Sequence, residues 1–201
     1  MIITIILFVL IALAVVLTRN MSTGTFKDVA DETNTAVLVK SFLDKMIPHH
    51  EMAIDESLKV MNDKDITESN VRIFAANIAD TQSFEIERMK TLYMEYLGSE
   101  YIPTVIIEAK KMDMEEMPAD LKGDELAKDY TKRMIAHHEE AVTIAKDYVK
   151  LIDKVRKESE KSENGLTVSN NHPAIDLSYE IAQEIIVTQE KEIEQLKAWD
   201  N

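Results

Sequence analysis

The sequence predicts an all-α protein, a four-helix bundle made of two duplicated helical hairpins. Three observations lead to this prediction. An eight-residue phrase occurs twice with six identical positions, as MIPHHEMA at 46–53 and MIAHHEEA at 134–141. Each copy is followed by a second shared phrase, TQSFEI at 81–86 and TQEKEI at 188–193. Apolar residues recur at helical spacing around all four phrases, and such an internal duplication fixes the architecture of a chain.

The composition excludes several classes of protein. The chain has 201 residues, 45% of them hydrophobic, which is enough for one domain with a real core. Its formal net charge is −14, so nucleic acid is not an expected partner, because phosphate binding needs clustered Lys and Arg. The absence of cysteine removes disulfides, thiolate nucleophiles and cysteine metal sites, and it suits an oxidising compartment.

The first element is an apolar N-terminal segment, residues 1–18. Its first 17 residues carry no charge, and as a helix they would span about 25 Å, close to the thickness of a bilayer core. The segment lacks a basic start and a clear cleavage site, so we expect an uncleaved transmembrane anchor that holds an extracytoplasmic domain, periplasmic or at the cell surface. The alternative is a signal helix that is cleaved to give a secreted protein. Residues 19–33 are expected to be a linker.

The bundle domain is expected over residues 34–200, with the first repeat at about 34–98. Its first helix should run from about 31 to 62, with a kink or restart at Pro48, since proline removes a backbone donor. The second helix should run from about 67 to 97 and end at Gly98. The core-facing stripes of the two helices place polar residues among apolar ones. They comprise Val39, Phe42, Leu43, Met46, His49, His50, Ala53, Ser57 and Val60, then Val71, Ala75, Ile78, Gln82, Glu85, Ile86, Met89, Tyr93 and Tyr96.

The second repeat is expected at about 124–200, after a connector at 99–123 that contains Met112, Met114 and Met117. Asp124 is expected to be the N-cap of a third helix that ends near residue 160, and a fourth helix should cover about 174–199. The second repeat carries a 19-residue insertion between its His pair and its Gln. Its core-facing stripes comprise Ala127, Tyr130, Met134, His137, His138, Ala141, Ala145 and Tyr148, then Ile181 or Ala182, Ile185, Gln189, Glu192, Ile193 and Leu196.

Polar groups therefore converge on the core of a small bundle: four histidines, two glutamines and two glutamates. Each buried polar group without a partner costs on the order of 1–3 kcal/mol. A self-satisfied His–Glu and His–Gln network would offset that cost and is the purely structural interpretation. Metal ligation is the other, and the expected ligands are Met46, His49, His50, Glu85, Met134, His137, His138 and Glu192. Gln82, Met89 and Gln189 are expected around them, and His172 is left out.

The ligand types favour copper. Met46, His49 and His50 stack on one face of a helical turn, as do Met134, His137 and His138. Thioether and imidazole together favour Cu(I), whereas imidazole and carboxylate alone also suit zinc, iron or manganese. Met112, Met114 and Met117 are expected to form an accessory, exposed copper-capturing patch, or else a flexible apolar lid. Glu85 and Glu192 are expected either to bind the metal or only to orient the imidazoles.

Signatures of catalysis are missing from the sequence. It has no glycine-rich phosphate loop, no G-x-S-x-G and no His-Glu-x-x-His. It also has no Glu-x-x-His, which di-iron or di-manganese bundles use on two helices. We therefore expect a protein that binds metal and is not an enzyme. A di-metal carboxylate protein with oxidoreductase activity is the alternative.

The duplicated Met-Ile-x-His-His-x-x-Ala, each copy followed by a helix with Gln-x-x-Glu-Ile, resembles the bacterial domain-of-unknown-function family 305. The resemblance covers about residues 36–199. It implies a ferritin-like four-helix fold in an exported or membrane-attached protein, and copper binding as in some members. The Met, His-His, Gln and Glu positions above match the family's motif, whereas Glu140 replaces the residue that matches Met52. A copper-delivery protein or a second copy of the chain is the expected partner besides the metal and the membrane.

Overall fold

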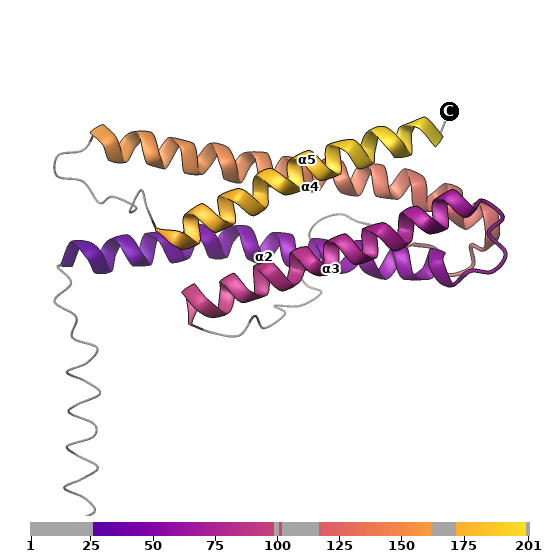
Figure 1. Cartoon of the computed structure of the whole chain (residues 1–201), viewed down its shortest axis with the longest axis horizontal. Coiled ribbons are helices and arrows are strands. Elements are labelled where there is room, and N and C mark those ends of the chain that lie inside the picture. Colours follow the sequence, from indigo (N-terminus) through magenta and orange to yellow (C-terminus); the bar gives the residue numbers. More distant parts are fainter. Residues whose placement is uncertain (1–25, 99–100, 102–116, 162–171, 200–201) are drawn as a thin grey trace, which may run out of the picture.

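The computed structural model describes residues 26–98, 101, 117–161 and 172–199. They form four helices, and no strand occurs within these ranges. The helices are α2 (Phe26–Asn62), α3 (Ser69–Leu97), α4 (Gly123–Lys161) and α5 (Pro173–Trp199), shown in Figure 1. The predicted all-α four-helix architecture is confirmed.

The helices pair as two hairpins. The most extensive contacts are α2 with α3 and α4 with α5, and the hairpins meet mainly where α2 packs against α4. In Figure 1, α2 and α5 run in one direction, and α3 and α4 run in the other. The chain therefore leaves α3 at one end of the bundle and begins α4 at the opposite end.

The core consists of two apolar clusters at opposite ends of the bundle. The first cluster contains residues 39–47 of α2, 86–93 of α3, 141–152 of α4 and 174–185 of α5. The second cluster contains residues 53–60 of α2, 71–78 of α3, 126–134 of α4 and Leu196 of α5. On each helix the His-His pair or the Gln-x-x-Glu segment falls between the two clusters. A polar layer therefore crosses the middle of the bundle.

The helical spacing in the sequence accounts for this core. Every residue predicted on the inner stripe of α2 and of α4 is buried. On α3 and α5 every residue predicted on the inner stripe is buried except Tyr96 and Glu192, which are half-buried. The period of 3.6 residues that selects these positions is the period of the α-helix, so the apolar stripe and the polar layer share one inner face.

α2 differs from the prediction in two ways. It begins at Phe26, so residues 26–33 are helical although they were expected to belong to a linker. This stretch contains good helix formers and lacks both glycine and proline, so nothing in it opposes the helix. The helix also continues through Pro48 as a single element rather than restarting there. Close packing of both flanks, with Ile47 and His49 fully buried, holds the helix together around the lost backbone bond.

The turn between α2 and α3 is joined to the start of α4. The Asp63 carboxylate accepts hydrogen bonds from the Asp65 and Gly123 N–H groups. The Asp124 carboxylate accepts two hydrogen bonds from Thr67, one from its N–H and one from its hydroxyl. These bonds hold the pKa of both carboxyls below the usual value. Asp124 thus lies inside α4 and caps the chain before α3, not its own helix as the sequence suggested.

No helix within the described ranges is long and apolar enough to cross a membrane. The expected anchor or signal segment, residues 1–18, lies outside the described residues.

Candidate metal centre

Each helix contributes to the polar layer from its inner face. α2 supplies His49 and His50, and α4 supplies His137 and His138 at equivalent positions. All four histidines are at most 2% exposed. α3 supplies Gln82 and Glu85, and α5 supplies Gln189 and Glu192. The structure thus brings together the polar core residues that the sequence predicted.

Within each hairpin one histidine meets one carboxylate. His50 Nε2 lies 2.9 Å from Glu85 Oε2 in a buried hydrogen bond. His138 Nε2 lies 2.9 Å from Glu192 Oε2, close enough for an ion pair but without the alignment of a hydrogen bond. The two contacts are equivalent under the duplication. A carboxylate in this position fixes the orientation of an imidazole and directs its proton to Nε2.

Between the hairpins, the other two histidines meet each other. The ring centroids of His49 and His137 are 3.8 Å apart, with their planes tilted by 53°. His137 Nε2 donates a hydrogen bond to the backbone carbonyl of His49 over 3.0 Å. Because a carbonyl can only accept, the proton of the neutral His137 ring sits on Nε2 and its Nδ1 carries a lone pair. The two repeats therefore meet at their histidines.

Many polar atoms in the layer have no partner. The Nδ1 atoms of all four histidines are buried and make no hydrogen bond, and the same holds for both amide atoms of Gln82 and Gln189. His49 has no hydrogen bond on Nε2 either. Buried polar groups are nearly always satisfied in folded proteins, so these atoms need partners beyond the protein contacts of the layer, from bound water or from a ligand. The side-chain contacts within the layer do not satisfy these atoms by themselves.

The environment keeps two of the histidines neutral. Burial lowers the pKa of His49 to about 4, and nearby His50 lowers it further, while the Glu140 carboxylate partly opposes the shift. Burial also lowers the pKa of His137 well below its usual value, with added repulsion from His49, His138 and His50. Neutral imidazole is the form that binds metal ions. Metal binding at these rings therefore requires no proton release at neutral pH.

The predicted methionines are buried next to the layer, on both sides of it. Met46 and Met89 belong to the first apolar cluster, and Met134 belongs to the second. This follows from the antiparallel packing of α2 and α4, because each methionine lies one turn before its own His pair. The position equivalent to Met89 in the second repeat is Leu196, so the side of the layer that faces the first cluster has the extra thioether.

Within the described ranges, no group of three or more His, Asp and Glu side chains is arranged so that it could hold a metal ion as it stands. A metal centre in the layer would therefore need ligands of another kind or a rotation of side chains. Thioethers are such ligands, and Met46 and Met134 are at hand one turn from the histidines.

Glu140 is a contact of the layer that the sequence did not predict as part of the site. Its Oε2 lies 3.8 Å from His49 Nε2, and its side chain is 35% exposed. In the sequence it is notable only as a departure from the repeat, because the equivalent residue of the first copy is Met52. Its position on α4, one residue past Glu139, gave no sign that it would face the histidine of the other hairpin.

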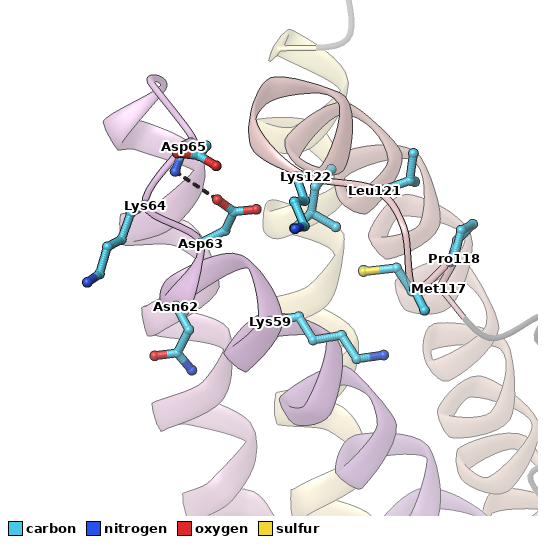
Figure 2. A pocket seen from close by; sticks show the side chains of 11 residues that line it. Lys59, Asn62, Asp63, Lys64, Asp65, Met117, Pro118, Leu121 and Lys122 are labelled. Carbon is cyan, nitrogen blue, oxygen red and sulfur yellow. Dashed lines mark hydrogen bonds between the residues drawn. The ribbon is translucent and has the colours of Figure 1, made fainter.

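Of the three predicted accessory methionines, the structure describes only Met117. Met112 and Met114 lie outside the described residues. Met117 is 4% exposed and packs in the second apolar cluster, so it is not the exposed capturing residue that was expected. It borders an open pocket of about 630 Å³ at the end of the bundle, between the α2–α3 turn and the start of α4 (Figure 2). None of the four core histidines lines this pocket, so it is separate from the polar layer.

Solved structures share the fold. The chain aligns with CopM in its Cu(I)-bound form at 24% identity and a TM-score of 0.52, over 80% of this chain and 94% of that one. CopM in its Cu(II)-bound form aligns at 22% identity and a TM-score of 0.55, over 81% and 95% of the two chains. A DUF305 fragment from Deinococcus radiodurans aligns at 19% identity and a TM-score of 0.57, over 80% and 93%.

Sequence comparison gives the family. A search of curated proteins finds no significant match. The family model described as "Domain of unknown function (DUF305)" matches residues 19–93 and 39–161, which together cover more than half of the chain and include both His-His pairs. With the duplicated motif and the shared fold, this match shows that the chain belongs to the DUF305 family.

Proposed function

We propose that this protein binds copper in the polar layer of its bundle, outside the cytoplasm, and sequesters the ion or passes it on without catalysing a reaction. The observation that carries the proposal is the set of four buried Nδ1 atoms that have no partner. Imidazole nitrogens with free lone pairs, gathered in one layer, are a donor set for a transition metal.

The contacts made by the Nε2 atoms of the layer support this role. In a metal site, a histidine ligand usually gives its other ring N–H to a carboxylate or a carbonyl. His50 faces Glu85, His138 faces Glu192, and His137 faces the His49 carbonyl, in each case through Nε2. On this proposal Glu85 and Glu192 orient imidazoles, and the Nδ1 atoms are the ligands. Because the His49 and His137 rings touch across the hairpins, the layer would act as one shared centre.

Copper is favoured by the neighbouring sulfur atoms. Met46 and Met134 are fully buried one turn from the two His pairs, and Met89 is buried on the first side. Thioether and imidazole donors select Cu(I) over harder ions. CopM, which has the same fold, is recorded in Cu(I)-bound, Cu(II)-bound and Ag-bound forms. Zinc, or a di-metal centre of iron or manganese with oxidoreductase activity, is the alternative, and the carboxylates of Glu85 and Glu192 would carry it.

An extracytoplasmic location agrees with three observations. The chain has no cysteine and begins with an uncharged apolar segment, proposed to be a membrane anchor or a signal. A DUF305 protein from Streptomyces coelicolor, assigned as secreted, shares the fold at 22% identity and a TM-score of 0.55, over 79% of this chain and 89% of that one.

Competition for Cu(I) tests the proposal. The full chain, free of metal and kept without oxygen, should withdraw Cu(I) from a coloured chelator such as bicinchoninate. The variant His50→Ala/His138→Ala should lose most of this capacity, since it removes one imidazole from each hairpin. His172→Ala is the matched control and should compete like the wild type, because His172 caps the start of α5 instead of entering the layer.

Two results would contradict the proposal. A wild-type chain that withdraws no Cu(I) does not use the layer for copper, and one that takes up iron or manganese instead supports the di-metal alternative. Equal losses in the His172→Ala and the double variant would show that binding does not depend on the layer.

A further inference from the structure

The four histidines of the layer are sealed from solvent, so a metal ion needs a route to them. Three carboxylates contact the histidines among the described residues, and their side chains differ in exposure. Glu85 is 7% exposed, Glu192 is 16% exposed and Glu140 is 35% exposed. Glu140 alone among them combines a contact to a buried imidazole with a substantial surface in water.

The contact that Glu140 makes also differs in kind. Glu85 and Glu192 approach their histidines to 2.9 Å, whereas Glu140 stays 3.8 Å from His49 Nε2. This distance is too long for a hydrogen bond. Neither ring nitrogen of His49 has a hydrogen-bond partner. A cation that reaches Glu140 therefore has a free imidazole nitrogen within a short step and no bond to break on the way.

The duplication shows that Glu140 is a departure from the repeat. Six of eight positions in the repeated phrase are identical, and the residue equivalent to Glu140 in the first copy is Met52. Replacing an uncharged thioether by a carboxylate puts a fixed charge at the boundary between solvent and layer on one side of the bundle. A carboxylate replaces water around a cation, and a local negative charge raises the concentration of cations beside it.

We infer that Glu140 is the residue through which the metal ion passes from solvent to His49, as a transient ligand and not as a member of the final centre. The inference rests on the proposed function, since it describes how that centre is filled. Glu140 acts on the rate of filling. A step that is crossed in both directions changes the association and dissociation rates together, and it leaves the equilibrium affinity nearly constant.

Stopped-flow measurement of Ag⁺ uptake by the metal-free full chain tests the inference. Ag⁺ is a soft ion like Cu(I) and is stable in water. The variants are Glu140→Gln, which keeps the shape, and Glu140→Met, which restores the residue of the first repeat. Glu139→Gln is the control, because it removes the same charge one residue away, where the carboxylate pairs with Lys197 at the surface.

We expect the association rate constant to fall about tenfold in both Glu140 variants, at the low end of what electrostatic focusing contributes. Dissociation should slow in parallel, with an unchanged amount of Ag⁺ bound at saturation. Glu139→Gln should keep the wild-type rates. A purely structural role would change stability or capacity without this paired change in rates.

Two outcomes overturn the inference while wild-type uptake stands. Glu140→Gln with the rates of Glu139→Gln would show that ions reach the layer elsewhere. Faster dissociation with a large loss of affinity would show that Glu140 is a permanent ligand. Failure of the proposed function would give a different result, since the wild type itself would then bind neither Ag⁺ nor Cu(I).

Discussion

Three of the four imidazole rings of the layer make a contact at one nitrogen and are left free at the other. His50, His137 and His138 each direct Nε2 to an oxygen, and Nδ1 stays buried without a partner. An isolated histidine in a protein core normally has hydrogen-bond partners for its polar atoms. Here the unsatisfied atoms of four rings gather in one layer, which is costly without bound partners and agrees with the cation binding that we propose.

The neutral state of these rings predicts how the metal-free protein responds to acid. An unfolded histidine has a pKa near 6.5, whereas burial lowers the pKa of His49 in the folded protein to about 4. Above pH 6.5 the ring is neutral in both states. As the pH falls from 6.5 towards 4, only the unfolded state takes up the proton, so the free energy of unfolding falls. Below about pH 4 the ring is charged in both states and adds no further loss.

For His49 alone, the expected loss between pH 7 and pH 5 is about 2 kcal/mol. His137 adds to it in the same direction, because its pKa is also lowered. Urea unfolding of the metal-free protein at the two pH values measures the loss. The variant His49→Gln/His137→Gln should show a clearly smaller loss than the wild type, and His172→Ala should match the wild type. An equal loss in the wild type and the double variant would contradict this assignment.

At the scale of the elements, the sequence predicted the helices closely. The expected ranges of 67–97, 124–160 and 174–199 differ from α3, α4 and α5 by at most two residues at either end. These helices are long amphipathic segments that adjoin polar turns or Gly98, Gly123 and Pro173, and such signals mark helix ends, which is why these predictions hold. Two features of α2 could not be predicted, its start at Phe26 and its continuity through Pro48. The early start depends on the helix propensity of residues 26–33, and the continuity depends on packing around Pro48, which outweighs the helix-breaking tendency of proline.

The layer could be predicted from the sequence only as a set of residues. Helical spacing placed His49, His50, His137 and His138 on inner faces, because the spacing gives the direction of a side chain from its own helix axis. Spacing does not tell which histidine meets a carboxylate of its own hairpin and which meets the other hairpin. The Glu140 contact with His49 depends on the register between α2 and α4, and no pattern within one helix contains that register.

Two glycines at helix ends give a matched test of the backbone. Gly98 and Gly123 both have a positive φ, at 64° and 58°. An added Cβ at Gly98 would meet nothing within 4 Å, whereas at Gly123 it would lie 3.1 Å from the Asp65 carbonyl oxygen. Gly98→Ala should therefore cost about 1 kcal/mol from the backbone conformation alone. Gly123→Ala should cost more, because the α2–α3 turn must also move.

Thermal and urea unfolding of the two alanine variants measure this difference. The comparison isolates the contact, since both variants share the same change in the unfolded chain. Equal costs would mean that the turn at Asp65 yields freely and that its bonds to Gly123 and Asp124 do little to hold the two hairpins together.

At the scale of the whole molecule, the duplication creates one layer out of two half-sets. Each hairpin brings a His pair, a Gln and a Glu, and antiparallel packing of α2 against α4 puts the two sets face to face. The halves are not identical. Met89 lies in the first cluster, whereas its equivalent in the second repeat, Leu196, lies in the second cluster. Glu140 carries a charge at the position where the first repeat has the uncharged Met52. A shared centre with unequal sides is the arrangement we propose.

Titration of the His49→Ala/His50→Ala variant with Cu(I), without oxygen and against a chelator of known affinity, tests this claim most directly. If the hairpins share one centre, removing the pair from α2 should weaken all of the bound copper, so the affinity falls for every equivalent that the wild type takes up. A variant that keeps half of the wild-type capacity at unchanged affinity would show two independent sites and would contradict the account.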